Sequence, residues 1–225
     1  MVKVLELFSG TGSVGKCCKE LDWEVVSVDM ILPADHQCDI MDFDYKQYDK
    51  DMFDIIWGSP PCQSYSRLQN TWKGKKRNGK IFTQDDINNM MNEADKLVLK
   101  TFEIIDYFKP QLWFVENPAT GRLKDRDIMQ DKPFYDVSYC MYSDWGYEKK
   151  TRIWTNKKDW NNLICDKSGA CGNMLENKKH KVSVALIGCG SQHNQPKDLK
   201  FLGKGTNRID RYRIPSDLIY SLFLD

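Results

Sequence analysis

The N-terminal segment limits the choice of fold more than any other part of the sequence. Residues 2–8, VKVLELF, are apolar and β-branched and predict a strand, whereas SGTGSVG over 9–15 interrupts that strand with three glycines. Helical spacing of apolar residues then appears over 13–21. A strand that passes through a tight turn into a helix is the opening unit of an α/β fold.

The same alternation of strands and helices continues along the chain. Further strands are predicted over 24–29, 38–40, 54–60, 112–118, 135–142 and 151–155. After a polar loop at about 63–82, helices are predicted over about 84–108 and 215–224. Because strands alternate with helices, we expect an α/β fold with a mainly parallel sheet and helices on both faces.

Three regions are expected along the chain. The 225 residues are enough for a sizeable core, which we place over 1–156. Residues 157–210 are rich in lysine, asparagine and glycine and fit the alternating pattern poorly, so we expect a small loop-rich insert there. Residues 211–225 are predicted to return to the core as the last helix.

Composition and charge exclude several classes of protein. The net charge of +1 gives no overall field that would attract nucleic acid or a membrane, so any basic surface must be local. The eight cysteines lack the spacing of a small secreted domain and are expected to be reduced thiols. We find no apolar run of membrane-spanning length and no signal peptide. We therefore expect an intracellular chain without a membrane partner, and we expect it to be a monomer.

The stretch GSPPCQSYS over 58–66 contains a candidate nucleophile. Pro60 and Pro61 fix two φ angles and remove two backbone donors, so the predicted strand before them cannot continue. Cys62 is therefore held at the carboxyl end of a strand, where ligands bind in open α/β sheets. A free cysteine is more often a small buried apolar residue, so this assignment needs support from the rest of the chain.

The glycine turn offers a candidate cofactor site. Gly10, Gly12 and Gly15 let the backbone approach a ligand at the start of a helix, although the same glycines also suit a plain tight turn. Asp29 ends the second predicted strand, where an acid can accept both hydroxyls of a ribose. Asp39 can accept from an adenine amino group, or both acids are solvated loop residues. Because the turn lacks the full dinucleotide pattern, an adenosine cofactor without a phosphate chain fits best.

Two further segments place polar residues near the same predicted sheet edge. FVENP over 114–118 ends a strand and contains Glu116, and EKKTRIW over 148–154 puts Lys150 and Arg152 on one face of a strand. In this order, LELFSGTGSVG, SPPCQSYS, FVENP and KTRIW resemble the cytosine-C5 methyltransferase family over about residues 2–156. The resemblance implies a Rossmann-like fold that depends on S-adenosylmethionine.

The resemblance also implies a chemical role for individual residues. Cys62 would add to C6 of cytosine, while a protonated Glu116 at N3 stabilises the charge that develops on the ring. Carbon 5 would then take the methyl group, which leaves S-adenosylhomocysteine, and loss of the C5 proton would expel the cysteine. Arg152 would hold the cytosine carbonyl or a nearby phosphate. The residues implied in cofactor binding are Phe8, Ser9, Gly10, Gly12, Ser13, Asp29, Met30, Asp39, Ile40, Ser59 and Pro60.

Double-stranded DNA is the partner that the resemblance implies, with the target base flipped out of the duplex. Residues 67–80, RLQNTWKGKKRNGK, follow the nucleophile and carry six basic residues and no acids. Such a run is usually a solvated surface, but its position after Cys62 favours closure over nucleic-acid phosphates. The residues expected at the nucleic acid are Gln63, Ser64, Arg67, Trp72, Lys73, Lys75, Lys76, Arg77 and Lys150.

The sequence departs from the family pattern in three places. Glu148 and Lys150 stand where the family has glutamine and its first arginine. The family's glycine–asparagine element near the C terminus is not recognisable, and the segment 157–210 is small beside the family's target-recognition domain. Two alternatives therefore stay open: a cytosine-5 methyltransferase of transfer RNA, and a catalytically silent homologue that binds cofactor or nucleic acid.

The insert contains three residues of types that bind zinc, Cys165, Cys171 and His180, with Cys189 and His193 beyond them. A zinc ion would staple a loop-rich insert. However, the spacing C-x5-C-x8-H is not a standard zinc motif. We therefore expect no bound metal and interpret the three residues as unrelated loop positions, with zinc as the alternative.

Overall fold

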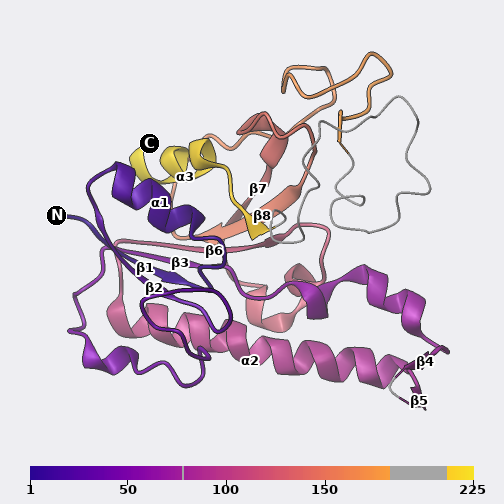
Figure 1. The fold of residues 1–225 in the computed structure, drawn as a ribbon, viewed down its shortest axis with the longest axis horizontal. Helices are drawn as coiled ribbons and strands as arrows, with labels where there is room; N and C mark the ends of the chain where they lie inside the picture. Colours follow the sequence, from indigo (N-terminus) through magenta and orange to yellow (C-terminus); the bar gives the residue numbers. More distant parts are fainter. Residues whose placement is uncertain (78, 183–211) are drawn as a thin grey trace.

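A six-stranded sheet lies at the centre of the molecule (Figure 1). The computed structural model describes residues 1–77, 79–182 and 212–225. The strand order is β2-β1-β3-β6-β8-β7, with bounds Lys3–Leu7 for β1, Glu24–Val28 for β2, Ile55–Gly58 for β3, Leu112–Pro118 for β6, Phe134–Ser138 for β7 and Lys150–Thr155 for β8. The first four strands in this order are parallel, and β8 runs antiparallel to both neighbours. The predicted α/β class is confirmed.

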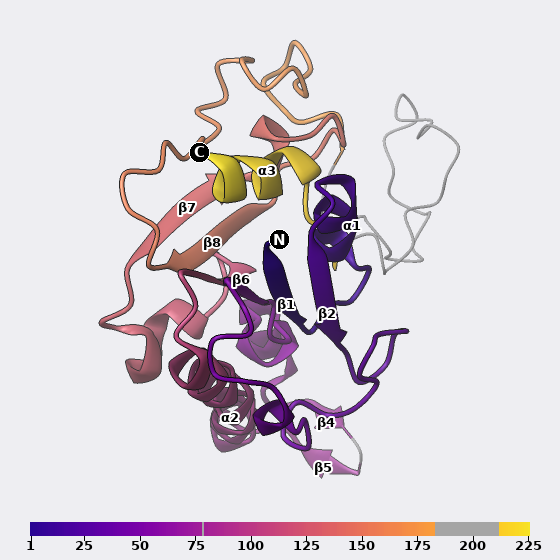
Figure 2. The same cartoon turned by 90° about the vertical axis from the view of Figure 1, so that its left-hand side faces the viewer.

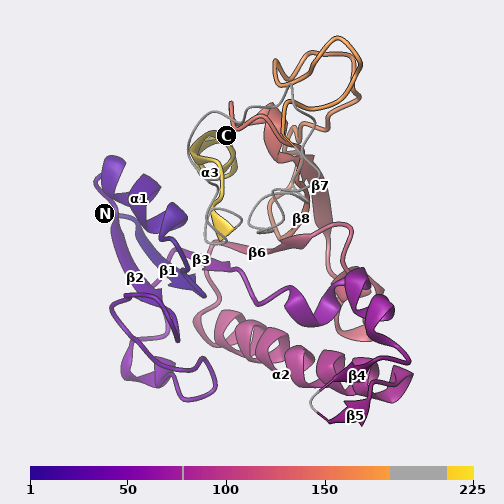
Figure 3. The same ribbon diagram turned by 45° about the vertical axis from the view of Figure 1, so that its right-hand side comes forward.

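Helices cover both faces of this sheet (Figures 2 and 3). Helix α2 (Gln84–Phe108) packs on one face, and α1 (Ser13–Glu20) lies beside α3 (Ser216–Leu224) on the other. Side chains alternate along each strand, so the core has two halves. In β6, for example, Val115 packs in the half that contains α2, and Phe114 packs in the half that contains α1 and α3.

The long helix α2 begins at a capping box. The Thr83 hydroxyl accepts a hydrogen bond from the backbone N–H of Asp86, and the Asp86 carboxylate accepts from the backbone N–H of Thr83. The helix ends at Lys109, which adopts a left-handed conformation. Its predicted bounds, about 84–108, agree with the structure because apolar periodicity and local capping signals coincide here.

Two sequence predictions about the connections were wrong. Residues 38–40 do not form a strand; a single bridge between Val28 and His36 is the pairing that the structure has in this region. The segment 63–82 is also more ordered than a polar loop, since it contains 3-10 turns at Gln63–Tyr65 and Arg67–Trp72 and a hairpin of β4 (Lys76–Arg77) and β5 (Lys80–Ile81).

The remaining 3-10 turns of the described residues connect the strands. They lie at Tyr45–Gln47, Leu123–Asp125, Asp127–Met129 and Tyr139–Met141. The last of these replaces the second half of the strand predicted over 135–142, because the chain turns away from the sheet after Ser138.

The C-terminal segment packs against the core. The backbone N–H of Ile214 donates to the Ser13 hydroxyl (3.1 Å), and the Phe223 ring packs against Trp57 and Phe114. The proposed division into a core at 1–156, an insert at 157–210 and a returning segment at 211–225 stays a prediction, since part of it lies outside the described residues. Within the described ranges, no helix has both the length and the apolar character needed to span a bilayer.

Candidate active site

The loop that carries Cys62 is anchored to the neighbouring strand β6. The Asn117 side-chain amide donates to the carbonyl oxygen of Pro60 (2.8 Å), and the backbone N–H of Arg122 donates to the carbonyl oxygen of Tyr65 (2.9 Å). The buried Tyr65 hydroxyl donates to Asp95 of α2 (2.9 Å). Cys62 itself is half-buried at the start of a 3-10 turn. These contacts fix the loop at the carboxyl end of β3, as the two prolines predict.

Glu116 lies on the same sheet edge and is 7% exposed. The Tyr139 hydroxyl donates a hydrogen bond to its carboxylate (3.1 Å), and the Lys149 ammonium lies 3.4 Å from the same oxygen. The ammonium also lies over the Tyr139 ring, 4.6 Å from its centroid. Glu116 is therefore held by a buried tyrosine and a partly buried lysine, neither of which the sequence analysis identified.

The position of Lys149 follows from the register of β8. Glu116 stands opposite Ile153 in the sheet, so Ile153 points to the face that carries Glu116, and Lys149, which directly precedes β8, reaches Glu116 on that face. Lys150 and Arg152 share the other face. The prediction that these two residues lie on one face is consistent with this register, but their face is the one opposite Glu116.

Arg152 stands opposite Asn117, the residue that anchors the Cys62 loop. Its guanidinium donates two hydrogen bonds to Asp136 (2.7 and 2.8 Å) and lies over the Phe134 ring, 3.5 Å from the centroid. The structure thus places Arg152 beside Asn117 and pairs it with Asp136. Its predicted contact with cytosine or phosphate stays a prediction. Lys150 is exposed and pairs with Glu148 (3.7 Å).

The glycine turn between β1 and α1 is built around Glu6, which is buried. The Glu6 carboxylate accepts hydrogen bonds from the backbone N–H groups of Val14 (3.2 Å) and Gly15 (2.9 Å), so it caps a helix whose N-cap residue, Gly12, offers no side chain. Burial raises the pKa of Glu6 to about 7, against the lowering effect of these two hydrogen bonds. Gly10 and Gly12 have φ angles of 52° and 65°, which favour glycine.

The predicted ribose ligand, Asp29, has backbone partners in the structure. Its carboxylate accepts from the N–H groups of Gly10 (2.9 Å), Ile31 (2.8 Å) and Leu32 (2.8 Å). A carboxylate has about four lone-pair sites, so capacity for a hydroxyl remains. Asp39 likewise accepts from the N–H of Met41 (2.9 Å). Both acids shape their own loops, and their roles toward a cofactor stay predictions.

The remaining predicted cofactor residues surround this turn. The Ser9 hydroxyl is buried and has no hydrogen-bond partner within the described residues, which suits a turn that receives a polar ligand. The Ser59 hydroxyl accepts from the indole N–H of Trp57 (2.9 Å). The other members of the set are the half-buried Phe8 and Ser13, the exposed Met30 and the buried Ile40 and Pro60.

Tyr212, which the sequence analysis did not single out, joins the two halves of the site. Its hydroxyl accepts a hydrogen bond from the Gln63 side-chain amide (3.1 Å), next to Cys62. Its Cβ lies 3.9 Å from the position that a Cβ on Gly10 would occupy. The returning C-terminal segment therefore lies against both the glycine turn and the nucleophile loop.

The basic segment after Cys62 is only partly available to a ligand. Arg67 pairs with Asp125 (3.2 Å), and the Lys73 ammonium donates to Gln84 (3.0 Å). The half-buried Trp72 packs edge-on against Phe82. Lys75 and Lys76 are exposed, and Arg77 is placed only by its backbone in β4. Ser64 is half-buried in the turn after Cys62.

The metal candidates Cys165, Cys171 and His180 do lie together, and Cys140 joins them. The interpretation of these three as unrelated loop positions does not agree with this cluster. The sequence analysis assigned Cys140 to a strand and therefore missed it.

Comparison with known proteins identifies the family. A family profile described as C-5 cytosine-specific DNA methylase matches residues 2–154. The "Probable DNA (cytosine-5)-methyltransferase" of Frog virus 3 (isolate Goorha) is 35% identical over 228 aligned residues, which cover 98% of each chain.

Solved structures also resemble this chain. The methyltransferase EhMeth of Entamoeba histolytica has 14% identity and a TM-score of 0.49, covering 74% of this chain and 57% of that one. The Dnmt2 methyltransferase of S. pombe has 13% identity and a TM-score of 0.44, covering 78% and 56%. The chain thus matches little more than half the length of these two structures. The profile and the viral relative together show that the chain belongs to the C-5 cytosine-specific DNA methylase family.

Proposed function

We propose that this chain methylates C5 of cytosine in DNA through a covalent adduct of Cys62. As a member of its family it is a methyltransferase, and S-adenosylmethionine is its methyl donor. The residues of the glycine turn fit that cofactor, because Ser9 offers a hydroxyl with no partner among the described residues and Asp29 offers a carboxylate with remaining capacity. When bound there, S-adenosylmethionine supplies an electrophilic methyl group.

The chemistry needs a nucleophile at C6 and an acid at N3, two atoms on opposite sides of the cytosine ring. The Cys62 thiolate adds to C6, and the electron pair of the C5–C6 bond becomes available at C5 while charge develops toward N3. Glu116, protonated, donates at N3 and limits that charge. Carbon 5 would then take the methyl group that S-adenosylmethionine supplies, and the proton at N3 would return to Glu116. Loss of the C5 proton to water would restore the C5–C6 double bond and expel the Cys62 thiolate, which regenerates the nucleophile.

The observation that carries this proposal is the hydrogen bond that the Asn117 side-chain amide donates to the Pro60 carbonyl oxygen. It connects the residue after Glu116 to the loop that presents Cys62, so the acid and the nucleophile belong to one rigid edge. Tyr139 and Lys149 fix the position of the Glu116 carboxyl group at this edge.

We further propose that the substrate is double-stranded DNA, bound by a monomer, and that the target base leaves the stack. A thiol cannot reach C6 inside a duplex. The exposed Lys75 and Lys76 follow the nucleophile and offer contacts to phosphate on the approaching strand.

Transfer of a labelled methyl group tests the reaction. We expect label in duplex DNA, and none in transfer RNA, with the wild-type chain and with Cys38→Ser as a control. Cys62→Ser should lose turnover and keep S-adenosylmethionine affinity, because a hydroxyl is a far weaker nucleophile. Label in transfer RNA alone would instead support the RNA alternative, and cofactor binding without any transfer would support a silent homologue.

Covalent addition has a separate readout. Duplex DNA that contains 5-fluorocytosine should form a denaturation-resistant complex with the wild-type chain, since fluorine cannot leave C5 as a proton. The complex should be absent with Cys62→Ser. An active enzyme that forms no such complex would refute the covalent step while leaving the methyl transfer itself intact.

A further inference from the structure

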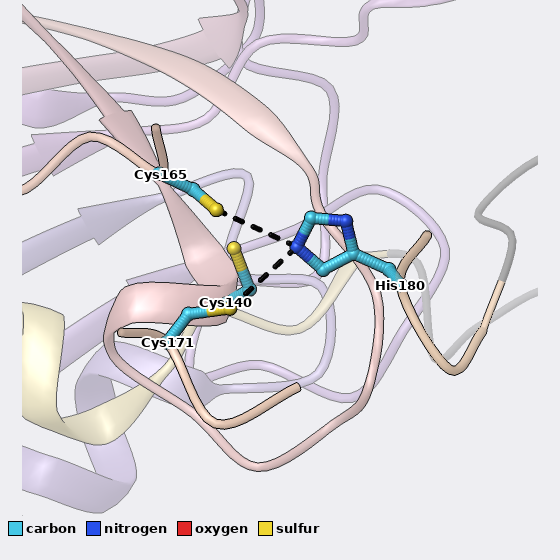
Figure 4. Close-up of side chains that lie close together, drawn as sticks. All are labelled: Cys140, Cys165, Cys171 and His180. Carbon is cyan, nitrogen blue, oxygen red and sulfur yellow. Dashed lines mark hydrogen bonds between the residues drawn. The ribbon is translucent and has the colours of Figure 1, made fainter. Parts of the chain in front are cut away.

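Four side chains meet beside the 3-10 turn that follows β7. They are Cys140 from that turn and Cys165, Cys171 and His180 from the segment after β8, and their sulfur and nitrogen atoms all lie within 4.8 Å of one another. Figure 4 shows the three sulfurs and the Nε2 nitrogen pointing toward one another. Nε2 of His180 lies 3.6 Å from Sγ of Cys165 and 3.7 Å from Sγ of Cys171.

These distances agree with tetrahedral zinc. Bonds of about 2.3 Å to sulfur and about 2.0–2.1 Å to nitrogen place neighbouring ligand atoms roughly 3.6–3.8 Å apart. Three thiolates and one imidazole also form a ligand set that is typical of structural zinc sites. Harder cations bind oxygen ligands instead. No cysteine in the described part of the chain forms a disulfide, so these sulfurs are available to a metal.

Hydrogen bonds hold the backbone around the four side chains in place. The buried Asn173 side chain donates to the carbonyl oxygens of Cys140 (2.9 Å) and Cys171 (3.0 Å), and its oxygen accepts from the N–H of Gly146 (3.1 Å). One amide therefore fixes two of the four candidate ligands. Lys167 adopts a positive φ of 63°, and its backbone N–H donates to the sulfur of Cys165. Such contacts orient ligands and stabilise thiolates.

We propose that Cys140, Cys165, Cys171 and His180 form a structural zinc site that fastens the insert to the catalytic core. Four protein ligands would fill a tetrahedral site, as in structural zinc sites, and two of them, Cys140 and Cys165, are buried. The segment from 156 to 182 has no helix or strand among its described residues. A metal bond therefore supplies the restraint that regular secondary structure does not. A cavity of about 530 Å³, lined in part by Cys140, Cys171 and Asn173, gives the ion a path of entry.

The metal content of the purified full-length chain is the first test. We expect about one zinc per chain by elemental mass spectrometry, which a strong chelator removes and Zn²⁺ alone restores. Co²⁺ added to the stripped chain should give the visible bands of a tetrahedral site with thiolate charge transfer. These measurements need no variant, so they do not depend on whether a mutant folds.

Variants then assign the ligands. His180→Ala should lower zinc affinity at least about a hundredfold, since outer contacts alone are worth ten- to a hundredfold. His180→Cys should retain the ion, because four thiolates also bind tetrahedral zinc. The control variant Cys38→Ser should bind as much zinc per chain as the wild type. The proposal would be overturned if the wild-type chain neither contained zinc nor bound Co²⁺. It would also be overturned if the mass of the chain, purified under reducing conditions, showed a disulfide among these cysteines.

Discussion

At the scale of single residues, the carboxylate of Glu116 depends on Tyr139. The tyrosine is fully buried and donates to the carboxylate, so replacing it by phenylalanine removes one donor and leaves the ring in place. A hydrogen bond between neutral groups is worth about 0.5–1.5 kcal/mol, so with Glu116 protonated we expect Tyr139→Phe to lower kcat by roughly two- to tenfold. The affinity for S-adenosylmethionine should not change.

A matched control for this variant lies across the molecule. Tyr45 also donates to a glutamate, Glu103 (2.6 Å), but on the α2 side of the sheet. Tyr45→Phe should therefore leave kcat at the wild-type value. Equal rates for Tyr139→Phe and the wild type in single-turnover experiments would remove Tyr139 from the active site.

Glu6 gives a second prediction at the residue scale, concerning pH. Its pKa rises from 4.5 to about 7 on folding because of burial, so between these values the folded chain binds more protons than the unfolded chain. The free energy of unfolding therefore falls as pH rises from about 4.5 to 7, by at most about 3 kcal/mol from this group.

Denaturant unfolding of the wild type and Glu6→Gln, at pH 5 and pH 7.5, isolates this effect. Glutamine does not titrate, so the stability of the wild type relative to the variant should be smaller at pH 7.5 than at pH 5. A difference that is constant or grows with pH would contradict the raised pKa of Glu6.

At the scale of elements, α3 completes the core although it lies far from the other helices in sequence. Leu222 is fully buried on the core-facing side of α3, whereas Leu224, two residues later, is 58% exposed. Leu222→Ala should lower the free energy of unfolding by about 2–5 kcal/mol, and Leu224→Ala by less than about 0.5 kcal/mol. Urea denaturation measures both, and similar values for the two variants would mean that α3 does not pack as described.

Elements also show where sequence reasoning succeeds and where it stops. Strands β1, β3 and β6 were predictable because continuous apolar, β-branched runs leave few other choices. The segment 38–40 offered a much shorter run, and only a bridge forms near it. For β8, period-two alternation shows which residues share a face, but the register with β6 decides which face meets Glu116.

The candidate site was also predictable only in part, namely for the residues that stand in local sequence motifs. Cys62 and Glu116 stand in local motifs, so the sequence alone indicates them. Tyr139 and Lys149 reach Glu116 only because β7 and β8 pair beside β6, which is tertiary information. Cys140 was missed for a related reason: its apolar neighbours indicate a strand, and its partners lie in another part of the chain.

At the scale of the whole molecule, a chain with a net charge of +1 must bind a polyanion through a local surface. Lys75 and Lys76, exposed at the start of the β4–β5 hairpin, are the best candidates among the described residues. If each contacts a phosphate, Lys75→Gln/Lys76→Gln should weaken duplex binding and reduce the slope of log K against log salt by about 0.9 per contact.

A control double variant removes two lysine charges from another part of the surface. Lys46 and Lys50 lie before β3, near the amino ends of the strands, with their ammonium groups over Tyr45 and Tyr107. Because ligands bind at the carboxyl ends of strands, Lys46→Gln/Lys50→Gln should leave the salt slope unchanged. Fluorescence anisotropy with labelled duplex, titrated at several salt concentrations, measures both slopes. Equal losses in the two double variants would show that DNA responds to net charge alone, and an unchanged slope for Lys75→Gln/Lys76→Gln would mean that DNA approaches from another side.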